Sequence, residues 1–405
     1  MRYFLYLFLL FALANPSVGS PPVAEPFEQA VATRLASHPD LEVARLTIRE
    51  AECRARAAGR LSDPELTGEL AGGPDAEGRF EAGLSQKFPL TARLRYERDL
   101  EDLGIEAARE EVRQREVELA RELRITLHES IEAQAQSNLQ RSRIETAQQL
   151  LADLESSSAG GESPAMDATA ARVEIGRLQA ELRRHEAAEA LVLGAAEVSW
   201  GTALPRVRER PIPASIPENP PVGPQQRPDL VLARLALQAS RVNTSLAKAN
   251  GWEDIALGIF IEGERFRTGS GGFEPESLAG VRLSIPLPLW RDTSAETGAR
   301  EIAAQSRQLQ LRNFEARAAR EAEAAWKVLV ARHRAVESFQ EALQSAVGQL
   351  DSLQSGGPEI PRSRFFEQSG LVHSLRSDLL KSRLDYHLAR SAWLFAAGLA
   401  QDPNP

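Results

Sequence analysis

The residues that could carry chemistry in this chain are a few histidines, and their positions argue against catalysis. His373 and His387 are fourteen residues apart, which on a helix corresponds to four turns, or about 20 Å along one face. They cannot bind the same metal ion. His128 and Glu129 are adjacent, so they point in different directions on a helix, and we expect both to be solvated. Nucleotide-binding, serine-hydrolase and zinc-protease motifs are absent from the sequence. We therefore expect no catalytic residue, no cofactor and no metal site.

Two further features have ordinary structural explanations. The segment Gly269-Ser270-Gly271-Gly272 is not followed by a helix with a phosphate-binding lysine, so it predicts a hairpin tip. The single Cys53 cannot form an intramolecular disulfide, and we expect it to be buried as a small apolar residue. The net charge of −9 and the pI near 5.5 argue against nucleic acid as a partner.

The N-terminus predicts export from the cytoplasm. Arg2 precedes an apolar stretch over residues 3–14, which is too short to span a bilayer. The small residues Ser17 and Gly19 follow at the two positions that a signal peptidase recognises, which favours cleavage after Gly19. We interpret residues 1–19 as a signal peptide. No cysteine lies directly after this stretch, so we expect no lipid anchor at a new N-terminal cysteine. No later segment approaches the ~20 apolar residues of a membrane helix, so entry into a membrane would require strands.

The sequence contains an internal repeat, with two copies of one structural unit. The segment from His38 to Leu46 matches that from Arg227 to Leu235, and the segment from Ala82 to Leu90 matches that from Ala279 to Leu287. Eight prolines between the copies predict an extended linker. The expected domains are a signal peptide (1–19), a first repeat (20–204), a Pro-rich linker (205–227), a second repeat (228–400) and a C-terminal tail (401–405).

Each repeat predicts the same order of elements: a helix capped by Ser37 in the first copy, two alternating strands, a long helix and a returning helix. The expected ranges are 39–62, 65–70, 79–88, 91–155 and 165–200 in the first copy, and 228–251, 255–261, 281–289, 292–354 and 362–399 in the second. Heptad spacing from Ala322 to Leu350 and from Val372 to Ala396 indicates coiled-coil seams. A helix of about 65 residues is about 100 Å long, so the chain predicts four antiparallel rods with a small sheet at one end.

Four strands cannot close a barrel, because the smallest membrane barrels use about eight. An open sheet in lipid leaves its edge groups unpaired, so several chains must complete one wall. Two chains would give eight strands and a filled interior, whereas three would give twelve strands and a lumen. The strand residues that we expect to face lipid are Phe80, Leu84, Leu257, Ile259, Val281, Leu283 and Ile285.

The duplicated units, the Pro-rich junction and the starts at His38-Pro39-Asp40-Leu41 and Arg227-Pro228-Asp229-Leu230 resemble the TolC-like outer-membrane efflux factors. The resemblance covers about residues 27–400 and is greatest to the branch that serves heavy-metal exporters. It implies a mainly α fold with a small β part: a homotrimer with an α-barrel in the periplasm and a twelve-stranded β-barrel in the outer membrane. It also implies a periplasmic adaptor and an inner-membrane transporter as partners. The expected function is a passive exit duct for efflux or type I secretion. The alternative is a periplasmic coiled-coil adaptor or scaffold without a membrane barrel.

Carboxylates near the two predicted helical turns are the candidate gate residues. In a three-fold assembly one inward Asp becomes a ring of three, which favours cations. The candidates are Asp153, Glu155 and Asp351, and each could instead be a solvated residue at a helix end. The turns themselves are the expected adaptor-docking region, with Ser157, Gly160, Gly161, Ser355, Gly356 and Gly357.

Overall fold

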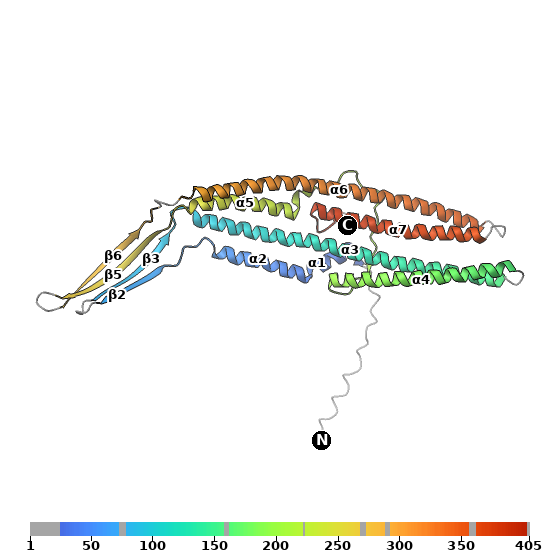
Figure 1. Ribbon diagram of the computed structural model, residues 1–405, viewed down its shortest axis with the longest axis horizontal. Helices are drawn as coiled ribbons and strands as arrows, with labels where there is room; N and C mark the ends of the chain where they lie inside the picture. Colours follow the sequence, from blue (N-terminus) through green and yellow to red (C-terminus); the bar gives the residue numbers. More distant parts are fainter. Residues whose placement is uncertain are drawn as a thin grey trace, which may run out of the picture.

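The computed structural model describes residues 25–72, 78–157, 162–221, 223–267, 273–287, 292–355 and 362–402. The molecule is elongated: the four strands of the larger sheet lie together at one end, and the ends of the long helices lie at the other (Figure 1). The predicted signal peptide, the hairpin tip at 269–272 and four of the proposed docking glycines (160, 161, 356 and 357) lie outside the described residues.

Seven α-helices make up most of the described chain. They are α1 (Phe27–Ala36), α2 (Pro39–Ala57), α3 (Arg93–Ser157), α4 (Glu162–Trp200), α5 (Pro228–Ala249), α6 (Ser294–Ser355) and α7 (Arg362–Ala397). The 65 residues of α3 make a rod about 100 Å long. Helices α2 and α4 pack along α3, while α5 and α7 pack along α6 and also contact α3 (Figure 1). The predicted mainly α architecture is therefore confirmed.

The start of the first repeat differs from the sequence prediction. Helix α1 was not predicted, although Phe27, Ala30, Val31 and Leu35 form its buried stripe. Ser37 does not cap the next helix, because its hydroxyl donates back to carbonyl oxygens of α1. The N-cap of α2 is His38, whose Nδ1 accepts a hydrogen bond from the Asp40 amide at 3.2 Å.

Two other expectations in this region were wrong. Helix α2 ends at Ala57 instead of residue 62, and Gly59 follows with a φ of +62°, a conformation that glycine adopts without steric cost. Cys53 is exposed on α2, not buried. It lies on the outer face of a helix that has few buried positions, because α2 covers α3 on one side only.

The returning helix of each copy ends against the N-cap of the helix that leads to the sheet, which is α2 in the first copy and α5 in the second. The Nε2 atom of His38 lies 3.3 Å from the carbonyl oxygen of Ser199, near the end of α4. At the matching position of the second copy, Arg227 reaches the carbonyl oxygen of Ala396 in α7 at 3.4 Å. Gly398 follows the last residue of α7 with a φ of +75°, and a Cβ there would lie 2.6 Å from the Cα of Arg227. The two short helices of a copy thus continue one another along the long helix.

The Pro-rich linker is extended except for two short elements. Strand β4 (Val207–Arg208) pairs in parallel with β1 (Glu25–Pro26), and a 3₁₀ turn, η1 (Pro224–Gln226), leads into α5. Ile212 and Ile216 of the linker pack against the α6–α7 core. The structure leaves the proposed domain boundaries as a prediction.

The larger sheet has four antiparallel strands in the order β2 (Glu65–Gly72), β3 (Gly78–Phe88), β5 (Ile255–Arg267) and β6 (Phe273–Ser284). The hairpin of each repeat is joined to the other by β3–β5 pairing, from Gly78↔Arg265 to Phe88↔Ile255. Strand β6 ends at Ser284, before the predicted end at residue 289, so Ile285 follows the strand.

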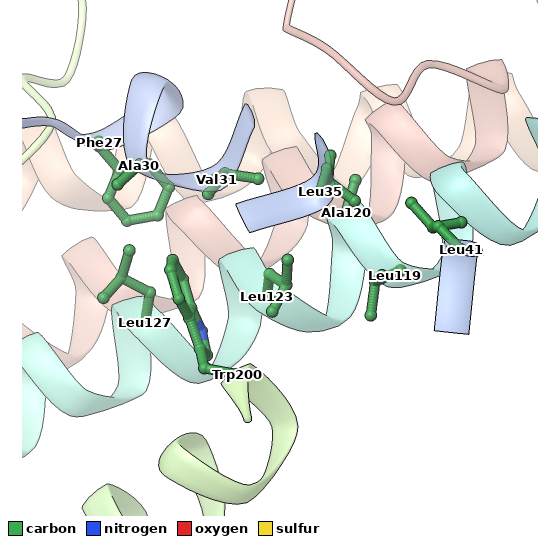
Figure 2. Close-up of a cluster of buried hydrophobic side chains, with 10 residues drawn as sticks. All are labelled: Phe27, Ala30, Val31, Leu35, Leu41, Leu119, Ala120, Leu123, Leu127 and Trp200. Carbon is green, nitrogen blue, oxygen red and sulfur yellow. The ribbon is translucent and has the colours of Figure 1, made fainter. Parts of the chain in front are cut away.

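The two larger apolar cores lie along the rods, and a smaller one joins Leu154 of α3 to Ala168 and Ala171 of α4. The first packs α1 and Leu41 against α3 and Trp200, as Figure 2 shows. The second joins α6 and α7 through seam residues that the heptad spacing predicted, among them Leu329, Val336 and Tyr386. Each such fully buried side chain contributes roughly 1.5–3 kcal/mol.

Candidate functional site: the two faces of the sheet and the helix ends

One face of the sheet is apolar and exposed in the single chain. The strand register places Leu84, Ile259 and Val281 side by side across β3, β5 and β6. Two residues further along β5 and β6, Leu257 lies beside Leu283. Because side chains alternate between faces, these residues point to the same side as Phe80. These six residues are between 45% and 69% exposed. The structure thus brings together six of the seven residues predicted to face lipid, and Ile285, also exposed, lies just beyond the strand.

The opposite face is polar. Glu81 of β3 stands directly across from Glu262 of β5, an arrangement that is unfavourable for two like charges. Two arginines compensate: Arg79 Nε lies 2.6 Å from Glu262, and Arg282 of β6 lies 2.5 Å from Glu81. The sheet therefore has one apolar face and one polar face with charged side chains.

The proposed gate carboxylates lie near the end of the rods that is far from the sheet (Figure 1). Asp153 and Glu155 are exposed in the last turns of α3, and Asp351 is exposed near the end of α6. Glu155 pairs with Arg172 of α4 at 2.6 Å. The structure brings the ends of α3 and α6 to the same end of the molecule, but it leaves the gate role as a prediction.

The proposed docking turns follow the same two helices. Ser157 is the last residue of α3, and Ser355 is the last residue of α6. The glycines proposed with them lie outside the described residues, so adaptor docking at these turns stays a prediction.

Sequence reasoning missed a buried cluster in the middle of the rods. The expectation that His128 is solvated was wrong: its ring is stacked between Phe27 and His387, with both pairs of ring centroids 4.1 Å apart. Helix α1 covers this position, and since α1 was not predicted, no signal indicated the burial. Among the described residues, neither ring nitrogen of His387 has a hydrogen-bond partner.

Burial controls the protonation of these histidines. It lowers the pKa of His387 to about 3, and the nearby Arg210, Arg390 and Arg383 act in the same direction. Burial, followed by the charge of His387, lowers the pKa of His128 well below its usual value. Both rings are neutral at pH 7.

Buried charges surround the stack. Glu28 of α1 lies 2.8 Å from Arg124 of α3 and 2.6 Å from Arg210 of the linker. Asp402 binds Arg210 at 2.9 Å and Arg390 of α7 at 2.7 Å. These ion pairs join the first helix, a long helix, the linker and the end of the described chain, which is a structural role.

The described residues contain no group of three or more His, Cys, Asp or Glu side chains that could hold a metal ion. In the same part of the chain, no helix has the length and apolar character needed to cross a membrane.

Comparison of the structure with solved structures gives several matches over nearly the whole chain. They define a class of fold: long paired helices that carry a small antiparallel sheet at one end. One match is CusC, whose structures describe folding and transmembrane channel formation; it is 18% identical, with a TM-score of 0.71 and 93% of each chain covered. Another is the open state of the MtrE outer-membrane channel of Neisseria gonorrhoeae, 14% identical, with a TM-score of 0.69 and 92% of this chain and 89% of that chain covered. The outer-membrane protein VceC of Vibrio cholerae is 15% identical, with a TM-score of 0.62 and 92% and 96% covered.

No protein-family model and no curated protein sequence matches the chain. The likeness to the solved structures therefore shows the fold, which is the TolC-like fold that the sequence predicted. The resemblance to the heavy-metal branch stays a prediction.

Proposed function

We propose that the protein is the outer-membrane channel of a tripartite efflux or type I secretion system, and that it acts as a passive exit duct. The observation that carries the proposal is the sheet with one exposed apolar face, held at the end of rods about 100 Å long. An apolar face of this kind is unfavourable in water and favourable in lipid. The rods extend from the sheet over a distance that suits the periplasm.

The order of the strands supports closure by several copies. Strands β2 and β6 form the edges of the sheet, and every neighbouring pair is antiparallel. The two edge strands consequently run in opposite directions, so β6 of one copy can pair with β2 of the next in the same antiparallel manner. Three copies give twelve strands, which leave room for a lumen. We infer a homotrimer in which outer-membrane lipid covers the apolar face.

The helices also present apolar side chains to a neighbour. Val173, Leu191 and Val198 on α4 are at least 70% exposed, and Ile302 and Leu309 on α6 are at least 60% exposed. Side chains of this kind are suited to contacts between copies in a helical tube. The proposed tube would lie in the periplasm and receive substrate from an adaptor and an inner-membrane transporter, which would supply the energy. Those partners follow from the fold resemblance, as does the absence of an enzymatic role.

The alternative, a coiled-coil adaptor or scaffold that stays in the periplasm, accounts for the rods but not for the sheet. An adaptor has no need for aligned apolar residues on one face of a four-stranded sheet, such as Leu84, Ile259 and Val281. The solved channels also match more than nine tenths of this chain.

The test combines fractionation with electrical recording. We expect the protein to remain in the outer-membrane fraction after a carbonate wash, and the purified protein to form discrete conductance steps in planar bilayers. A monomer that is soluble without detergent and leaves bilayers unchanged would contradict the proposal.

A further inference from the structure

The polar face of the sheet is crossed by one compact group of large side chains, which we call the central belt: Arg79, Glu81, Phe260, Glu262 and Arg282. The belt spans β3, β5 and β6. Small residues lie next to it on this face: Thr67, Gly83 and Gly280 in the row of Phe260, and Gly258 in the row of Arg282. The larger neighbours of the belt on the same face are Glu69, Glu264 and Leu278.

Glycines allow the belt to form. A Cβ at Gly280 would lie 2.7 Å from the ring of Phe260, so the ring rests flat over β6 only because residue 280 has no side chain. Arg282 reaches from β6 across β5 to Glu81 on β3, and its own partner in the register on β5 is Gly258, which has no side chain. Its guanidinium carbon lies 4.9 Å from the centre of the Phe260 ring, which is close enough for a cation–π contact.

The arginines cover the carboxylates. The side chains of Glu81 and Glu262 are 11% and 18% exposed, whereas those of Arg79 and Arg282 are 48% and 57% exposed. Arg79 Nη2 also lies 3.8 Å from Glu81. Each carboxylate thus holds a guanidinium in place and leaves part of it open to the solvent. The exposed surface of the belt is cationic, although the polar face as a whole contains more glutamates than arginines.

We propose that the central belt is an anion-binding site that selects solutes in the sheet part of the channel. This inference rests on the proposed function, because the polar face lines a lumen only when several copies close the barrel. Oriented guanidiniums bind carboxylate, sulfonate and phosphate groups through paired hydrogen bonds, and rings of Arg favour anions in pores. In a trimer the belt supplies six guanidiniums at one level of the lumen.

The test uses opposite shifts from the two partners of one ion pair. In planar bilayers under a KCl gradient, Arg282→Gln uncovers Glu81 and should move the reversal potential towards cations. Glu81→Gln removes the covering carboxylate and should move it towards anions, while Arg282→Lys keeps the charge and should stay near the wild type. Block by pyrenetetrasulfonate should weaken roughly tenfold in the variant Arg79→Gln/Arg282→Gln, since that variant loses the charged hydrogen-bond donors that would hold a sulfonate group.

The control is the second ion pair on the same face, Lys87 with Glu65, which lies outside the belt and is more evenly exposed, at 46% and 55%. Lys87→Gln and Glu65→Gln make the same charge changes and should give clearly smaller shifts. Yield in the outer membrane and the far-UV circular dichroism spectrum verify that each variant folds.

The outcomes separate the two proposals. The proposed anion-binding site is overturned if the wild-type protein conducts and the Arg282→Gln and Glu81→Gln variants have the same reversal potential and the same block. That result leaves the channel function intact. Equal shifts from the control pair also overturn the proposed site, because they would show that any charge on this face is sufficient. A wild-type protein that never conducts overturns the proposed function itself.

Discussion

At the scale of single residues, the stack of Phe27, His128 and His387 joins α1, α3 and α7 through aromatic contact alone. A neutral histidine stacks well in an apolar site, but its protonated form is excluded by burial and by the nearby arginines. The stack therefore makes the fold sensitive to acid.

The pH dependence has a definite sign. The folded state holds the pKa of His387 at about 3, whereas the unfolded chain takes up the proton near pH 6.5. Between these values the unfolded state binds more protons, so stability falls as the pH is lowered, by at most about 1.4 kcal/mol per pH unit for this residue. We expect His387→Phe to keep the stack and to reduce this loss, as measured by melting temperature in detergent between pH 7.5 and pH 4.5.

A control for this prediction is Phe27→Leu, which retains both histidines. It should lower the melting temperature at every pH and leave the slope with pH as in the wild type. Parallel loss of stability in the wild type and His387→Phe on acidification would contradict the role given to His387.

At the scale of elements, Glu28 of α1 links α3 and the Pro-rich linker through two ion pairs. Its carboxylate pairs with Arg124 and Arg210, whose side chains are 3% and 8% exposed. Loss of one partner of a buried ion pair costs about 3–5 kcal/mol, and we expect Glu28→Gln to destabilise the protein at the lower end of this range. Thermal unfolding in detergent measures the effect. The matched control is Glu50→Gln on α2, where the pair with Arg54 is 67% and 56% exposed; its cost should stay below about 1 kcal/mol.

The two faces of β6 give a second prediction for an element. Leu283 and Ser284 are adjacent and point to opposite faces of the sheet. If lipid covers the apolar face, Leu283→Arg places a charge in the bilayer at a cost of up to about 2–4 kcal/mol, and less protein should reach the outer membrane. Ser284→Arg adds the same charge to the polar face and should leave the yield close to the wild type. Equal yields of the two variants, measured by immunoblotting of membrane fractions, would argue against lipid contact.

The sequence predicted the elements whose pattern is periodic and missed those that depend on distant contacts. Alternation over β3 and β5 and the seam through Leu329 and Tyr386 follow directly from residue spacing. Helix α1 has only ten residues, and its stripe is stabilised by α3 more than by its own propensity. The belt was equally hidden, because the contact between Glu81 and Arg282 joins residues 201 positions apart. The gate carboxylates could be placed at the helix ends, but no sequence pattern tells which of them face a lumen.

At the scale of the whole molecule, the proposed channel has charged groups at both ends of the rods. The belt lies in the sheet, while Asp153 and Asp351 lie near the ends of α3 and α6 at the opposite end (Figure 1). The 62 residues of α6 separate them by roughly 90 Å. Since the Debye length at physiological ionic strength is about 8 Å, the two groups cannot influence each other directly. They would act as independent filters in series.

Independence of this kind gives a prediction about combined variants. Asp153→Asn/Asp351→Asn removes negative charge at the helix ends and should move the reversal potential towards anions, opposite to Arg282→Gln. Because the sites are far apart and share no partners, the variant with all three substitutions should show the sum of the two shifts, measured in planar bilayers under the same KCl gradient. Unchanged conductance and ion preference in Asp153→Asn/Asp351→Asn would remove these residues from the gate. A triple variant that departs from additivity would show that one end controls the flow through the other, as expected if the helix ends close the duct on their own.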